Sequence, residues 1–126
     1  MYSPKKYQET LVELATALLA LAHPARLKVI EHLAKYHECP AGEISSDLPI
    51  CKSTVSQHMA KLRAAGFISS NQSGVSQHYR LNNDNLKNVI QQLELFGEYV
   101  ELLSKKKTEC KKSLNNHETE IYSGII

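Results

Sequence analysis

Apolar residues recur at helical spacing over most of the chain, and this pattern predicts a largely α-helical protein. A first helix is expected from Pro4 onward, because proline fits the first turn and leucines and alanines follow at three- and four-residue intervals. A second helix is expected to begin at His23-Pro24. Its inward-facing residues would be Leu27, Ile30, Leu33 and Ala34. A short third helix fits between Pro40 and Pro49.

The stretch from Cys51 to Leu81 combines a helix, a glycine and two short strand-like runs. The apolar stripe of this helix consists of Val55, Met59 and Leu62. The helix begins at Cys51, Lys52 or Ser53, of which Ser53 suits the N-cap best by residue type. Gly66 is the expected left-handed stop. The runs at 67–68 and 79–81 flank a polar loop, whose Gln-Ser-Gly sequence suits the turn of a β-hairpin.

The longest helical pattern begins at an Asn83 or Asp84 cap and ends near Lys105. Its main stripe comprises Leu86, Val89, Ile90, Leu93, Phe96, Val100 and Leu103. A second stripe comprises Leu95, Tyr99 and Leu102. A helix that is apolar over most of its circumference needs two burial partners, so we expect one stripe to meet a second subunit. Residues 1–106 are expected to form one domain, and residues 107–126 a polar, flexible tail.

Charge is distributed unevenly along the chain, although the formal net charge is only +2. Residues 48–83 contain no Asp or Glu, and this segment carries all of the net excess of positive charge. Its four cationic residues are Lys52, Lys61, Arg63 and Arg80. Small polar, amide and cationic side chains without anions favour a polyanion whose bases offer hydrogen-bonding edges, which is DNA.

Length and cysteine usage limit the class of protein. The 126 residues fit one domain, no apolar run approaches the roughly 20 residues that span a bilayer, and the first ten residues lack the core of a signal peptide. We therefore expect a cytoplasmic protein with reduced thiols. The three cysteines show no zinc-finger spacing. No nucleophile–base pair or paired carboxylate is visible, so an enzyme is not expected.

The middle of the chain resembles the arsenic-repressor (ArsR/SmtB-type) family of winged-helix transcriptional regulators. The resemblance is carried by His23-Pro24-Ala25-Arg26, by the run from Ser53 to Gly66, and by His78-Tyr79-Arg80-Leu81, within a match over roughly residues 10 to 105. It implies a mainly α fold with a small β-hairpin, a winged helix-turn-helix in the order α-α-α-α-β-β-α. It also implies a homodimer joined through the first and last helices, and repression from an inverted-repeat operator.

The helix that begins near Ser53 is the expected recognition helix in the major groove. Base edges would be read by Thr54, Ser56, Gln57 and His58. Phosphates would be held by Lys52 and Ser53 at the helix start and by Lys61 and Arg63 along it. The hairpin would form the wing, with Gln77, His78 and Arg80 as polar contacts. Wings in the resembling family often carry more Lys or Arg at the tip, which is uncharged here.

The resemblance also implies sensor sites, most of whose ligands are missing. The cysteine-pair segment of the family retains only Cys39, the last helix has no histidine, and the cysteines of a persulfide-type pair are absent. Cys39 with His37 and a tail ligand, Cys110 or His117, is a residual metal candidate. Cys51 is a redox candidate, since a helix N-terminus lowers a thiol pKa, or an inert residue in place of a serine.

Two alternatives remain open for the function. The protein could be a constitutive regulator that senses no metal or thiol signal itself. It could also be a winged-helix module for protein interaction, which the uncharged wing tip would favour.

Overall fold

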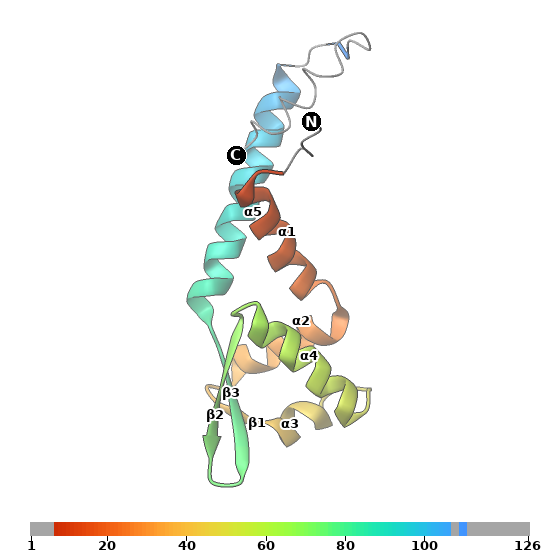
Figure 1. Ribbon diagram of the computed structural model, residues 1–126, viewed down its shortest axis with the longest axis vertical. Coiled ribbons are helices and arrows are strands. Elements are labelled where there is room, and N and C mark those ends of the chain that lie inside the picture. Colours follow the sequence, from red (N-terminus) through yellow and green to blue (C-terminus); the bar gives the residue numbers. More distant parts are fainter. Residues whose placement is uncertain (1–6, 107–108, 111–126) are drawn as a thin grey trace, which may run out of the picture.

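A computed structural model of the chain describes residues 7–106 and 109–110. Its elements are α1 (Glu9–Leu21), α2 (Pro24–Lys35), β1 (Cys39–Pro40), α3 (Ala41–Ser46), α4 (Lys52–Ala64), β2 (Ile68–Ser73), β3 (Ser76–Leu81) and α5 (Asn83–Lys105). The helices α2, α3 and α4 lie in the half of the molecule that carries the β2–β3 hairpin, and α5 extends toward the opposite end beside α1 (Figure 1). The order of helices and hairpin agrees with the expected winged helix-turn-helix.

The sheet has one strand more than the sequence indicated. The three strands are antiparallel in the order β1-β3-β2, and the short β1 pairs Cys39 with Tyr79 and Pro40 with His78. The hairpin strands are also longer than expected, and they include Gln72 and Ser73 of the expected loop. Strand pairing continues to Ser73 and Ser76, so Gly74 and Val75 form a two-residue turn, with Gly74 at φ 63°.

One core joins every helix to the sheet. Its fully buried side chains are Val29, Cys39, Ile44, Leu62 and Phe67. Leu14 connects α1 to this core and Val89 connects α5. α1 and α5 each contribute one buried residue and several half-buried ones to this core, and both helices also carry exposed apolar side chains.

Helix ends follow the local sequence with two shifts from expectation. Helix α4 has Cys51, not Ser53, at its N-cap, and α5 is capped by the Asn82 side chain, which accepts from the Asn85 N–H at 3.2 Å. The end of α4 is as predicted, since Gly66 adopts φ 81°. The Phe67 N–H donates to the Leu62 carbonyl at 3.0 Å, which completes a Schellman-type stop.

The inward stripe of α2 differs from the prediction. Leu27 is 54% exposed and Ala34 is exposed, whereas the buried residues are Ala25, Arg26, Val29 and Leu33. The stripe therefore runs through positions 26, 29 and 33, with a charged residue as its first member. The pattern was misread because Arg26 was not counted among core positions.

Among the described residues, no single helix has the length and apolar character needed to cross a membrane, and α1 and α2 meet that requirement only as a pair bent by 85°. α1 begins at Glu9 with Gln8 as its N-cap, so this helix starts later than the first turn expected at Pro4. Most of the segment 107–126 lies outside the described residues, so the expectation for it is not tested.

Candidate nucleic-acid interface

The outer surface of α4 carries most of the residues that the sequence singled out. The buried side of the helix consists of Val55, His58, Met59 and Leu62. Opposite them, the exposed positions are Lys52, Ser53, Ser56, Gln57, Ala60, Lys61, Arg63 and Ala64. Helical spacing places Ser53 and Gln57 along the middle of this outer surface. The structure thus leaves the hydroxyl and amide side chains of this surface accessible, with no acidic residue among them.

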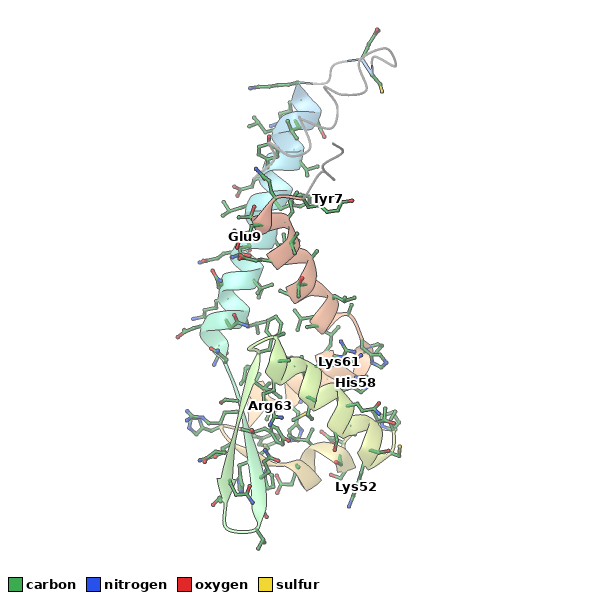
Figure 2. The ribbon with its side chains drawn as sticks, in the orientation of Figure 1. Tyr7, Glu9, Lys52, His58, Lys61 and Arg63 are labelled. Atoms are coloured by element: carbon green, nitrogen blue, oxygen red, sulfur yellow. The ribbon has the colours of Figure 1, made fainter. Side chains whose placement is uncertain are left out.

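The two flanks of α4 face different neighbours. Arg63 lies on the side of the hairpin, where its Nη1 donates to Ser70 Oγ of β2 at 3.0 Å. Lys61 lies on the opposite flank, next to α1 and the start of α2, whereas Lys52 is at the far end of the helix (Figure 2). The cations therefore bracket the polar middle of the helix.

His58 does not take part in this outer surface, contrary to the prediction. It is only 8% exposed, and its Nδ1 accepts a hydrogen bond from Arg26 Nε at 3.1 Å. Its pKa is lowered, chiefly by burial and then by the positive charges of His23, Arg26 and Lys61. His58 is thus a neutral structural acceptor that fixes α4 against α2.

Arg26 is the centre of this contact between helices. Its Nη1 donates to the carbonyls of Leu19 at 3.2 Å and Ala20 at 3.0 Å, at the end of α1. A guanidinium at a helix C-terminus is favoured both by these free carbonyls and by the helix dipole. The ring of His23 lies 4.3 Å from that of His58 and caps α2 by accepting from the Ala25 N–H. One arginine therefore connects three helices.

The wing presents polar but mostly uncharged side chains. Along β3, Gln77 lies on the same side of the strand as the buried Tyr79, whereas His78 and Arg80 lie on the opposite side. Arg80 is exposed, and Val75 at the turn is fully exposed. Of the three predicted wing contacts, Arg80 is therefore the one with both a positive charge and full access to a phosphate.

Cys51 occupies the start of the recognition helix. Its Sγ lies 3.2 Å from Ser53 Oγ and 3.2 Å from Thr54 Oγ1, and the residue is exposed. These hydroxyls, the Ser53 contact first, lower the pKa of the thiol to about 7. Both polar contacts and the N-terminal position favour the thiolate.

The residual metal candidates are not brought together in the described part of the chain. No three His, Cys, Asp or Glu side chains within residues 7–106 and 109–110 are placed to hold a metal ion. Cys39 is a core residue with 1% exposure, and burial raises the pKa of its thiol. Cys110 is exposed, and His117 lies outside the described residues.

Comparison with known proteins matches this geometry to a family. Residues 23–70 match the family model described as "Bacterial regulatory protein, arsR family". The chain is 34% identical over 79 residues to the transcriptional repressor PagR of Bacillus anthracis, an alignment that covers 63% of this chain and 79% of PagR. The chain belongs to the ArsR family. It is therefore a DNA-binding transcriptional regulator.

Two further comparisons extend over most of this ArsR-family chain. It is 33% identical over 76 residues to the transcriptional activator HlyU of Vibrio cholerae, covering 60% of this chain and 69% of HlyU. The structure of an ArsR-like transcriptional regulator from Rhodococcus sp. RHA1 superposes with a TM-score of 0.67 at 26% identity, covering 79% of this chain and 94% of that one.

Proposed function

We propose that this protein is a homodimeric repressor that reads an inverted-repeat operator with α4 in the major groove. The observation that carries the proposal is the outer surface of α4, where polar side chains are accessible, acids are absent and cations lie on both flanks. Gln57 is the principal base reader, because an amide can donate to and accept from one adenine. Ser53, Thr54 and Ser56 contribute hydroxyls beside it.

Phosphate contacts are assigned to the exposed cations around this surface. Lys52 stands at the start of α4, Arg63 on the side of the wing, and Arg80 on β3. Lys61 occupies the flank next to α1, and it would contact the DNA backbone from that side. These contacts fix orientation and supply a salt-dependent share of the affinity.

The uncovered stripes of α1 and α5 are the proposed dimer surface. On α5, the exposed apolar residues are Ile90, Leu93, Leu95, Val100, Leu102 and Leu103. On α1, Val12 and Leu19 are 46% and 71% exposed and lie seven residues apart on one side of the helix. A two-fold dimer buries both sets and sets two α4 helices toward two half-sites about one helical turn apart.

The direction of regulation is proposed from PagR, whose name is that of a repressor. Since HlyU is named as an activator, transcription must be measured in addition to binding. In vitro transcription from the bound promoter should fall as protein is added. An increase would reverse the assignment while leaving DNA recognition intact.

Substituting Gln57 with alanine tests the recognition surface. A binding site is first selected from a random DNA pool, and affinities are then measured by fluorescence anisotropy on that site and on its single-base variants. Gln57→Ala should weaken binding to the selected site by about 1–3 kcal/mol, and the loss should disappear when one particular base pair is changed. The reason is that only one position loses its amide partner.

The matched control is Gln91→Ala on α5, an exposed glutamine remote from α4. It should bind as the parent protein does. A Gln57→Ala variant that weakens all sequences equally would remove Gln57 from base reading. If the parent protein cannot distinguish any selected site from random DNA, operator reading by this surface is wrong, and the protein-interaction alternative gains support.

The thiol of Cys51 gives a pH-dependent prediction. Because the pKa of Cys51 is lowered to about 7, the rate of its reaction with iodoacetamide should rise with pH and reach half its plateau near pH 7. The alkylated protein should lose DNA affinity, since the adduct stands at the start of the recognition helix. Mass spectrometry of tryptic peptides separates Cys51 from Cys110, which serves as the internal reference. A half-maximal rate above pH 8 at Cys51 would contradict the assignment.

A further inference from the structure

A groove lies between α1, the start of α2 and the C-terminal half of α4. Its volume is about 460 Å³, within the range of small-molecule sites. The residues that matter most for its chemistry are Thr16, Leu19, Ala20, Arg26, Lys61 and Ala64. It borders one flank of the outer surface of α4, because Lys61 and Ala64 belong to both.

The charged side chains that line the groove are both positive. Arg26 is 9% exposed, and among the described residues it has no carboxylate partner. Its Nε and Nη1 are engaged by His58 and by the end of α1, but its Nη2 has no hydrogen-bond partner in the described part of the chain. Lys61 lines the same groove and is exposed. A buried guanidinium without a counter-ion favours an anion beside it.

The rest of the lining is apolar and small. Ala20 and Ala64 leave room between α1 and α4, and Leu19, which is also part of the proposed dimer surface, lies at the edge of the groove. The lining therefore combines two cations with an apolar wall and contains no acidic residue. A ligand that complements both parts has one anionic group and a hydrocarbon body.

We propose that this groove binds a small organic carboxylate with an apolar body, whose carboxylate is held by Arg26 and Lys61. Coupling to DNA follows from the position of the groove and rests on the proposed function of α4. A ligand in the groove touches α4 and also the place where α1 packs against α2. It changes DNA affinity to the extent that its own affinity differs between the free and the DNA-bound arrangement of these helices.

Octanoate is the probe, and 1-octanol is its neutral counterpart. Both are titrated into the full chain without DNA, and binding is measured by calorimetry and by chemical-shift changes of the alanine methyl groups. Octanoate should bind with a Kd at or below about 1 mM and shift the methyl signals of Ala20 and Ala64. Octanol should bind at least about tenfold more weakly, because it lacks the charge that Arg26 and Lys61 would hold.

Thr16 offers a matched pair of variants on the α1 side, and it is not itself assigned a contact with DNA, although Lys61 lines the same groove. Thr16→Glu places a carboxylate beside the two cations and should weaken octanoate binding at least about tenfold. Thr16→Gln has a side chain of similar size without charge and should retain the parent affinity. Both substitutions lie at an exposed helix position, and thermal melts followed by circular dichroism verify that each variant folds.

The outcomes separate this proposal from that of the DNA-reading surface. Octanoate binding that Thr16→Glu abolishes supports the groove even if no operator is found. The proposal would be overturned if octanoate did not bind to the full chain, for example because a second copy of the chain fills the groove. It would also be overturned if octanol bound equally well, or if the methyl shifts were confined to residues outside the groove. DNA binding by the parent protein would stand in each of these cases.

Discussion

Replacing Phe67 with alanine is expected to lower the free energy of unfolding by about 3–5 kcal/mol. Phe67 is 0% exposed and directly follows the glycine that ends α4. Its N–H donates to Leu62 at 3.0 Å and its carbonyl accepts from the Asn82 N–H at 2.8 Å, so its backbone is fixed from both sides. The surrounding elements cannot close over the missing ring, and a cavity remains. Urea denaturation monitored by circular dichroism measures the loss.

Val75→Ala is the control for this measurement. Val75 is fully exposed at the hairpin turn, so its truncation should change stability by no more than about 0.5 kcal/mol. If Phe67→Ala cost less than about 1 kcal/mol, the core would be able to collapse around the substitution. The contact of α4 with the hairpin and α5 would then be looser than the structure indicates.

The recognition helix was predictable because its core residues are all apolar. Val55, Met59 and Leu62 are buried as their spacing predicted, and Gly66 adopts the positive φ expected of a helix stop. In such a segment the hydrophobic period and the stop residue both predict the same helix with the same end. Ser53, Ser56 and Gln57 are exposed as expected, whereas Thr54 is half-buried.

His58 was misplaced because its burial depends on that of Arg26. Separately, histidine and arginine are expected at the surface, and either residue would be costly to bury alone. Together they satisfy one another, although they are separated by 32 positions in the sequence. A hydrophobic pattern contains no signal for such a pair. The pattern does show that Val29 and Leu33 form a stripe whose preceding position, at helical spacing, is Arg26.

The third strand was missed for a related reason. β1 has only two residues, Cys39 and Pro40, and its pairing with β3 is imposed by the hairpin and not by any local preference. Such short strands carry no alternation to detect. Pairing with β1 nevertheless matters for the wing, since it covers one edge of β3 and ties the hairpin to the α2–α3 connection.

The apolar stripes of α5 have a different status, because the sequence and the structure agree that one molecule does not cover them. Leu95 and Leu102 are 64% and 51% exposed and lie seven residues apart. They occupy a different side of α5 from the buried Val89. Their exposure therefore does not depend on how tightly α1 packs against α5.

Substituting Leu95 and Leu102 together with glutamate is expected to raise the dimer dissociation constant by at least about a thousandfold. Each leucine buried at the interface contributes about 1.5–3 kcal/mol, a two-fold dimer counts each twice, and the new carboxylates oppose their own symmetry mates. Sedimentation equilibrium measures the change, and Lys87→Glu, which changes the charge at an exposed position on the polar side of the same helix, should leave the dimer intact. Operator affinity should fall with dimerisation, because each monomer then binds a single half-site. If the double variant remains dimeric, the interface lies elsewhere. If it is monomeric and still binds the full operator as tightly as the parent, DNA recognition does not depend on dimerisation.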